Sequence, residues 1–257
     1  MNSKKWEGWN SPDDNNQLYV DVCSQASVDG GVFSKFKSIQ AYKNVLEHVS
    51  TEQGRYYLSI IEEMTDSLGK NLEAFKENDK YGQPTLGNFP SIGSISPTTL
   101  RYIKNTFDMA SLVEETPISK IVEVGGGYGG LCKTLSVVCD FDEYVLIDLP
   151  EVVKLQDRYL SNFPDLYKKC VFVPCTESKE IKDIDLFISN YALSECDDET
   201  QMMYFDDLIS NSQFAYLVYN VVNFREYKLE NFIKKLKEIF TVTTSEDLEN
   251  IVLYSKK

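Results

Sequence analysis

The sequence predicts an α/β fold, in which a mostly parallel sheet is covered by helices on both faces and preceded by a helical N-terminal region. Three observations support this prediction. From residue 118 onward, short apolar runs alternate with helical patterns, as expected of a parallel sheet. Two further apolar runs at the end are separated by a turn too short for a parallel crossover, so they should form an antiparallel edge hairpin. Between the first strand and helix of this half lies a bend with five glycines in six positions, 125–130.

Length and composition place these elements in one large domain, or in one domain with an appendage. The chain has 257 residues, of which 42% are hydrophobic and 26% are charged, a balance that is ordinary for a globular protein. We predict that residues 1–95 form a mostly helical cap with a substrate loop. Residues 96–257 are predicted to form the α/β domain.

The charge of the chain argues against several classes of partner. With a formal net charge of −14 and no Lys/Arg cluster, it should repel nucleic acids and anionic membrane surfaces. No apolar run approaches the roughly 18–20 residues that span a bilayer, and the N-terminus lacks the apolar core of a signal peptide. We therefore expect a soluble, cytoplasmic protein that binds small neutral or cationic molecules.

The cysteines and the single histidine do not suggest a metal centre. None of the six cysteines forms a Cys-x-x-Cys pair, and several lie in apolar runs where a thiol packs as a small hydrophobe. We expect them to be reduced. Because His48 is the only histidine, no zinc site is expected.

The first part of the chain should be mainly helical. Residues 1–34 are polar and turn-rich with isolated apolar anchors, and from 34 to about 78 the apolar spacing is that of amphipathic helices. The Gly- and Pro-rich loop at 81–95 is expected to act as a lid. A serine–proline pair at 96–97 then predicts the start of a helix that continues to about residue 112.

From residue 118 onward, strands and helices alternate. Strands are predicted at 120–124, 144–148, 170–173, 185–189 and 214–222. Helices are predicted at about 130–139, 151–162, 198–210 and 228–239. The final antiparallel hairpin is predicted at 240–245 and 250–254.

The glycine bend fits two different cofactor motifs. Read as G-x-G-x-x-G from 125 to 130, it matches the dinucleotide fingerprint, with Asp148 roughly 20 residues further on. Read as E-x-G-x-G-x-G from 123 to 129, it equally resembles the motif of class I S-adenosylmethionine (SAM) methyltransferases. A third alternative is a glycine-rich turn that only packs a helix on a strand.

Ligand chemistry favours SAM. A dinucleotide places a pyrophosphate at a helix N-terminus, where free N–H groups attract anions. SAM has no phosphate and carries an ammonium that needs acceptors, so the acid Glu123 at the end of the first strand suits it. Asp148, which ends the second strand, can accept the ribose hydroxyls of either cofactor. The antiparallel hairpin and the lack of a second alternating half also argue against a nicotinamide enzyme.

The combined motifs resemble those of the sugar O-methyltransferases found with glycan-assembly enzymes. The resemblance covers roughly residues 82–225 and rests on ISPTTLRY at 95–102, VEVGGGYGG at 122–130, VLIDLPE at 145–151 and ISNYALSE at 188–195. It implies a class I methyltransferase fold, which is a Rossmann-like seven-stranded sheet in the order 3-2-1-4-5-7-6 with strand 7 antiparallel. It also implies methyl transfer from SAM to a sugar hydroxyl, with deoxyhexoses such as rhamnose as acceptors. The chain could then be a module that works with glycosyltransferase domains.

The cofactor should lie outside the carboxyl ends of the strands, as ligands of open α/β sheets do. The residues expected to hold SAM are Glu123, Gly125, Gly127, Tyr128, Gly129, Asp148, Leu149, Thr176, Glu177 and Asn190. Within this set, Asp148 takes the ribose and Leu149 lies against the adenine. Thr176 or Glu177 contacts the adenine amino group, unless these two residues form only a surface turn.

The reaction centre is expected where the fourth strand ends. Asn190 and Tyr191 should face the transferable methyl group, and Tyr128 and Tyr191 can offer ring faces to the sulfonium unless they are core aromatics. Glu195 is the candidate base for the proton of the acceptor hydroxyl. Its alternative role is to cap the following helix.

The acceptor is expected to lie against Thr99, Arg101 and Tyr102, at the start of the helix that follows the Gly/Pro loop. Packing or salt bridging would explain the same residues. A divalent metal held by the acids after residue 194 is not favoured, so no metal ligand is assigned. Two alternative functions stay open: methylation of a small non-sugar acceptor, and a non-catalytic SAM-binding module of a glycan-assembly complex.

Overall fold

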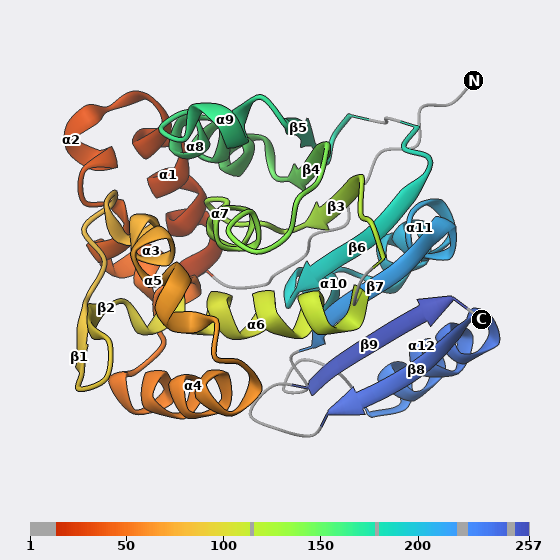
Figure 1. Ribbon diagram of the computed structural model, residues 1–257. Helices are drawn as coiled ribbons and strands as arrows, with labels where there is room; N and C mark the ends of the chain where they lie inside the picture. Colours follow the sequence, from red (N-terminus) through yellow and green to blue (C-terminus); the bar gives the residue numbers. More distant parts are fainter. Residues whose placement is uncertain (1–13, 114–115, 178–179, 220–225, 246–249, 257) are drawn as a thin grey trace.

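The computed structural model describes residues 14–113, 116–177, 180–219, 226–245 and 250–256. A cap of helices and a small hairpin precedes an α/β half, and the carboxyl ends of the parallel strands point toward the cap (Figure 1). The predicted α/β class, with a parallel sheet and an antiparallel pair at one edge, is confirmed. Residues 1–13 of the predicted cap and 220–222 of the predicted fifth strand lie outside the described residues.

The central sheet contains seven strands in the order β5-β4-β3-β6-β7-β9-β8, which is 3-2-1-4-5-7-6 when they are numbered along the chain within this sheet. Their bounds are β3 (Lys120–Val124), β4 (Glu143–Asp148), β5 (Cys170–Pro174), β6 (Ile184–Asn190), β7 (Ser212–Tyr219), β8 (Phe240–Ser245) and β9 (Asn250–Lys256). Strands β3 to β7 pair in parallel, whereas β9 is antiparallel to both β7 and β8.

Helices cover both faces of this sheet. Their bounds are α6 (Pro97–Val113), α7 (Gly130–Leu135), α8 (Pro150–Leu160), α9 (Pro164–Tyr167), α10 (Ala192–Glu195), α11 (Asp198–Asp207), the 3-10 turn η3 (Ile209–Asn211) and α12 (Glu226–Ile239). Alternate strand residues enter two cores, as the pleat requires. Ile121 and Leu146 belong to the core that includes α6, α7 and α8, whereas Val122 and Ile147 belong to the core that includes α11 and α12.

The cap consists of α1 (Asp14–Val28), α2 (Gly30–Phe33), η1 (Phe36–Ser38), α3 (Gln40–Val45), α4 (Thr51–Met64), α5 (Leu68–Lys76), η2 (Glu77–Asp79), β1 (Gly87–Phe89) and β2 (Gly93–Ile95). Helix α1 corrects the prediction that residues 1–34 are turn-rich. Tyr19, Val22, Cys23 and Ala26 are buried at helical spacing and form one apolar face among polar neighbours. This face packs beside α8.

The predicted lid at 81–95 contains the hairpin β1–β2, which the sequence analysis did not predict. Phe89 and Ile95 in it are fully buried, in a small core shared with α4 and α6. A Cβ built on Gly54 of α4 would lie 2.9 Å from the Phe89 ring, so the hairpin and helix are closely packed. This part of the segment is therefore a packed wall of the cap.

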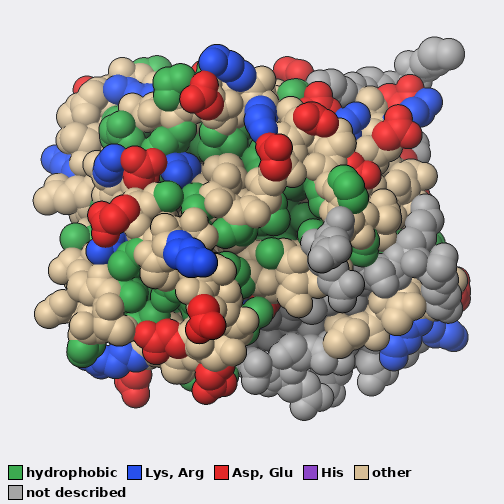
Figure 2. Space-filling view, viewed as in Figure 1, with side chains coloured by type: hydrophobic (Ala, Val, Ile, Leu, Met, Phe, Trp, Pro, Cys, Tyr) green, Lys and Arg blue, Asp and Glu red, His purple; other side chains and the backbone are tan. Residues whose placement is uncertain are grey.

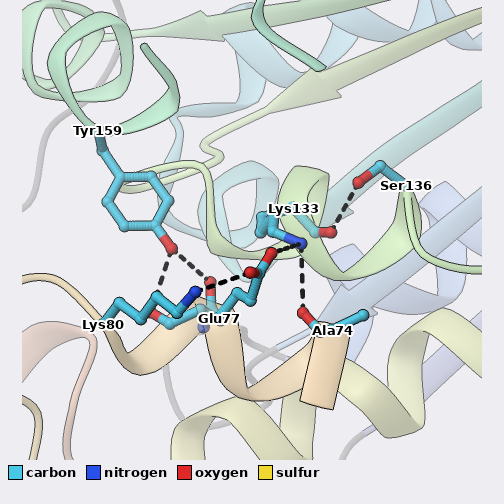
Figure 3. A network of polar contacts seen from close by, with 7 residues as sticks. Ala74, Glu77, Lys80, Lys133, Ser136 and Tyr159 are labelled. Atoms are coloured by element: carbon cyan, nitrogen blue, oxygen red, sulfur yellow. Dashed lines mark hydrogen bonds and ion pairs between the residues drawn. The ribbon is translucent and has the colours of Figure 1, made fainter. Parts of the chain in front are cut away.

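Buried polar contacts join the cap to the α/β half (Figure 3). Lys133 of α7 donates to the Ala74 carbonyl at 3.2 Å and pairs with Glu77 Oε2 at 3.5 Å. Tyr159 of α8 donates to the carbonyl and side-chain oxygens of Asn78, at 3.1 and 2.8 Å. Two helices of the α/β half thus hold the end of α5 and η2 in place.

Helix α6 links the two parts of the chain. The Thr98 N–H donates to Ser96 Oγ at 3.2 Å, in agreement with a serine at the helix start. Further along the helix, Lys104 pairs with Asp108 at 2.7 Å, and Tyr216 of β7 donates to the same carboxylate at 2.8 Å. These contacts fix α6 against the sheet, so that its first turn lies between the cap and the strand ends.

The surface carries charges of both signs. On the face drawn in Figure 2, Lys and Arg side chains are interspersed with Asp and Glu. Within the described part of the chain, no helix combines the length and apolar character that a membrane crossing needs.

Candidate functional site

The glycine bend leads the chain from β3 into α7 through three left-handed residues. Gly125, Gly127 and Gly129 have φ angles of +79°, +57° and +90°, a region that residues with a Cβ avoid. The Gly125 N–H donates to the Ile147 carbonyl at 2.9 Å, which holds the start of the bend against β4.

Protein side chains press against this bend. A Cβ built on Gly125 would overlap the Ala192 methyl group, and one built on Gly127 would lie 2.7 Å from Leu46 Cδ1 of the cap. Close packing therefore explains much of the glycine content without a ligand. Evidence for a cofactor at this bend must therefore come from the polar groups around it.

Asp148 ends β4 beside the bend and is partly exposed. Its Oδ2 accepts the Gly127 N–H at 3.1 Å and the Gln156 side chain at 3.0 Å, and its Oδ1 accepts the Leu149 N–H at 2.8 Å. A carboxylate offers about four lone-pair sites, so capacity remains for a hydroxyl donor. Burial raises the pKa of Asp148 to about 7, the N–H donors lower it, and the negative charge of Glu195 adds to the rise.

Glu123 lies beneath the bend in the sheet core. Its Oε2 accepts the Tyr144 hydroxyl at 2.8 Å and would lie 2.9 Å from a Cβ on Gly126. Burial raises the pKa of Glu123 to about 7, while the Tyr144 hydrogen bond lowers it. In these contacts Glu123 supports the bend from below.

Strand β6 ends next to the bend, because Ala192 packs on Gly125. Tyr191 has a φ of +68°, and its N–H donates to the Val218 carbonyl at 2.7 Å. The Asn190 Oδ1 atom is buried and has no hydrogen-bond partner. Since buried polar atoms are nearly always paired, this oxygen is an acceptor that could take a hydrogen bond from a bound group.

Arg101 of α6 connects the cap with the end of β6. Its Nη2 donates to the Leu46 carbonyl at 3.3 Å, and its guanidinium lies 5.6 Å from the centre of the Tyr191 ring. The side chain is almost completely buried. The structure thus brings Arg101 and Tyr191 together, as an acceptor site at the strand end would require.

Thr99, Tyr102 and Tyr128 lie in the interior of the protein. Thr99 accepts the Asn78 side chain at 2.8 Å. The fully buried Tyr128 packs edge-on against Tyr102, and Lys37 Nζ lies 3.9 Å from the centre of the Tyr128 ring. The structure therefore gives the Tyr128 ring a core position, and only its backbone belongs to the bend.

Thr176 and Glu177 are exposed in the turn after β5. The Glu177 N–H donates to the Pro174 carbonyl at 2.9 Å, which is the surface-turn arrangement. The Cys175 N–H donates to the Asp148 carbonyl at 2.7 Å, so this turn adjoins the end of β4.

Glu195 is half-buried in α10. It does not cap the following helix, because Asp197 does so by accepting the Thr200 N–H at 2.8 Å. Glu195 lies close enough to Asp148 for its charge to raise the pKa of that carboxyl. The structure therefore places Glu195 on the Asp148 side of the site.

The contribution of the cap to this site was not predicted from the sequence. Leu46 covers Gly127, while Glu47 and Lys37 are buried charged residues nearby. The available signal was a charged residue inside the apolar run 45–49. That signal does not reveal which neighbour the charge meets.

Two further features lie away from this arrangement. A cavity of about 440 Å³ opens where β4 and β5 begin, at the opposite edge of the sheet, and its lining includes Phe141 and Lys169. In the described ranges, no three His, Cys, Asp or Glu residues are grouped so that they could hold a metal ion.

The sequence matches no family model and no curated protein. The fold is similar to that of several solved methyltransferases. These include the mitomycin 7-O-methyltransferase MmcR (15% identity, TM-score 0.44, covering 63% of this chain and 56% of that one). They also include the methyltransferase domain of bacterial CtHen1-C (12%, 0.47, 60% and 98%) and a SAM-dependent methyltransferase from Aquifex aeolicus (14%, 0.42, 58% and 88%). The chain thus spans little more than half the length of MmcR.

Proposed function

We propose that this protein transfers a methyl group from SAM to a hydroxyl group of a sugar. The observation that carries the proposal is the partnerless, buried Asn190 Oδ1 beside a bend of left-handed glycines. A dinucleotide pyrophosphate would need donors at this place, whereas the ammonium of SAM needs an acceptor.

The residues around the bend fit the parts of SAM. Asn190 Oδ1 would accept from the ammonium, and the remaining acceptor capacity of Asp148 would take a ribose hydroxyl. Leu149 and the turn at 176–177 adjoin Asp148 and would border the adenine. When bound, SAM supplies a methyl group on a positively charged sulfur.

The protein itself would contribute alignment and proton removal. A sugar hydroxyl is a weak nucleophile, and holding it in line can supply about 7–11 kcal/mol of the barrier. Arg101 lies beside Tyr191 at the strand end, and Thr99 and Tyr102 belong to the same helix start. The sugar itself, with a deoxyhexose such as rhamnose as the first choice, comes from the sequence resemblance, as do cytoplasmic glycan-assembly enzymes as partners.

Calorimetry tests the cofactor. We expect heat of binding from SAM and from its product S-adenosylhomocysteine, and none from NADH. Asp148→Asn should weaken binding about 10- to 100-fold, because a hydrogen bond to a charged group contributes about 1.5–3 kcal/mol. Asp165→Asn is the matched control, since its side chain is fully exposed (100%). Saturation by NADH with no response to SAM would refute the proposal.

An acceptor panel tests the reaction. Purified protein and SAM are incubated with methyl rhamnoside, nucleotide-sugars and a simple phenol, and methylated products are detected by mass spectrometry. Methylation of a sugar supports the proposal. Methylation of the phenol alone would identify a small-molecule methyltransferase, and binding of SAM without any product would identify a non-catalytic module.

A further inference from the structure

A cluster of buried charges lies where the cap meets the glycine bend. It consists of the buried Lys37 of η1, Glu47 in the turn after α3 and Arg101 at the start of α6, together with the partly buried Asp79 of η2. Lys37 is 0%, Arg101 4% and Glu47 7% exposed. Charged groups are rarely buried so deeply unless they are paired.

Most of these charges have partners within the cap. Lys37 Nζ donates to the Asn78 carbonyl at 2.7 Å. Asp79 accepts the Thr99 hydroxyl at 2.6 Å and the Ser96 N–H at 2.7 Å. Both carboxylate oxygens of Asp79 are therefore satisfied.

Glu47 differs from its neighbours. Its Oε1 atom is buried without a hydrogen-bond partner. The Ser96 hydroxyl makes a long contact of 3.5 Å with its Oε2 atom, and the Thr98 side chain also interacts with the carboxylate. A buried carboxylate oxygen that lacks a donor is unfavourable. A ligand hydroxyl would supply that donor.

The position of Glu47 points to the reaction centre. The preceding residue, Leu46, packs on Gly127, and the Leu46 carbonyl accepts from Arg101. The Arg101 guanidinium in turn lies beside the Tyr191 ring. Glu47 therefore directly follows the residue that contacts both the bend and Arg101, and Arg101 leads to the end of β6, where the proposed function puts the methyl group.

We propose that Glu47 is the base that accepts the proton of the acceptor hydroxyl, in an acceptor site between the cap and the start of α6. This inference rests on the proposed function. The acceptor oxygen bonds to the methyl carbon while its proton passes to Glu47 Oε1. The bond from that carbon to sulfur breaks, and its electron pair stays on sulfur, so charge and atoms balance.

The cluster also indicates the class of acceptor. Its two cations and two carboxylates balance formally, so an additional charged group would lack a counter-ion. Ser96, Thr98 and Thr99 add hydroxyl groups at the start of α6. This composition fits a neutral, hydroxyl-rich group such as a sugar ring.

The electrostatics suit a base at neutral pH. Burial raises the pKa of Glu47 to about 7, against the lowering effects of Lys37, the Thr98 side chain and Arg101, while Asp79 adds to the rise. A base works best when its pKa is near the working pH. The tyrosines whose pKa values Glu47 helps to raise are Tyr102, Tyr128 and Tyr159.

Glu195, the base predicted from the sequence, is the alternative candidate for this role. The full chain is compared as wild type, Glu47→Gln, Glu47→Asp and Glu195→Gln, with methyl rhamnoside as acceptor. Glu52→Gln is the matched control, because Glu52 is an exposed glutamate of the same cap.

For Glu47→Gln we expect kcat to fall 10²- to 10⁴-fold, the typical contribution of a general base. S-adenosylhomocysteine affinity should be unchanged in calorimetry, which also shows that the variant is folded. Glu47→Asp should recover part of the rate, and Glu52→Gln should match wild type. Carbon-13 NMR of labelled glutamate carboxyls should show, besides the group of Glu123, a second group with a midpoint near pH 7. This second group should be absent in Glu47→Gln and should shift when methyl rhamnoside is added.

Full turnover by Glu47→Gln, or a Glu47 resonance that ignores the acceptor, would overturn the inference. A larger loss of kcat in Glu195→Gln than in Glu47→Gln would assign the base to Glu195. If wild type binds no SAM or methylates no sugar, the proposed function itself has failed. The two failures are thus distinguishable.

Discussion

Gly125 is the residue of the bend that tolerates least change. Its left-handed backbone and its contact with Ala192 each exclude a side chain. Because Ala192 follows Asn190 and Tyr191, the same contact sets the distance between the bend and the end of β6. One glycine thus positions both sides of the candidate site.

Replacing Gly125 with alanine should destabilise the protein by at least about 2 kcal/mol, from backbone strain together with overpacking. Gly69→Ala is the matched control, since a Cβ on Gly69 of α5 would meet nothing within 4 Å. That variant should stabilise the helix by about 0.5–1 kcal/mol. Urea unfolding measures both changes, and equal stabilities of the two variants would contradict this account.

At the scale of elements, α7 and the end of α5 are held together by Lys133, whose side chain is only 8% exposed. Lys133→Ala should lower the free energy of unfolding by about 1–3 kcal/mol, because the Ala74 carbonyl loses its donor in a buried place. Lys168→Ala removes an exposed ion pair with Asp165 and should change stability by less than about 0.5 kcal/mol. Chemical denaturation of both variants checks the difference. Similar losses would show that this link between cap and sheet is unimportant.

The strands were predictable because they are short apolar runs, and most of the parallel ones are followed by a helical pattern. Strand β3 has its predicted bounds, and β4 begins one residue before its prediction. Helix α1 was not recognised, because its four buried residues are separated by polar ones and the helix is stabilised by packing on α8. The hairpin β1–β2 was not predicted for a similar reason, because its two short strands are stabilised by packing in the cap core.

The residues of the candidate site also differ in whether they could be predicted from the sequence. The glycines, Asp148 and Asn190 could be predicted as candidate residues because they lie at strand ends, where ligands of open α/β sheets bind. Glu47 could not, since its burial and its polar neighbours result from tertiary contacts with elements far along the chain. Local spacing carries no information about such a contact.

At the scale of the whole molecule, three carboxyls with raised pKa values make stability depend on pH. The pKa values of Glu47, Glu123 and Asp148 are raised to about 7, mainly by burial. The folded state therefore holds protons that the unfolded state releases above about pH 4–4.5. This contribution is fully present below the unfolded pKa and is lost as pH rises through about 7.

We therefore expect the free energy of unfolding to decrease by an amount on the order of a few kcal/mol between about pH 5 and 7.5. The melting temperature should fall over the same range. Glu123→Gln removes one of the three titrations and should make the decline shallower. Scanning calorimetry across this range in buffers of constant ionic strength provides the measurement. A stability that is flat or increases with pH would show that these carboxyls are ionised in the folded protein.

The left-handed backbone at Tyr191 limits how far the heat resistance of this protein can be increased without changing the candidate site. A non-glycine residue in such a conformation costs on the order of 1–3 kcal/mol, which the rest of the fold must offset. Selection for heat resistance alone would favour relaxation of this turn. The same relaxation would move Asn190 and the Arg101–Tyr191 contact from their positions, so stability would be gained at the expense of the geometry of the candidate site.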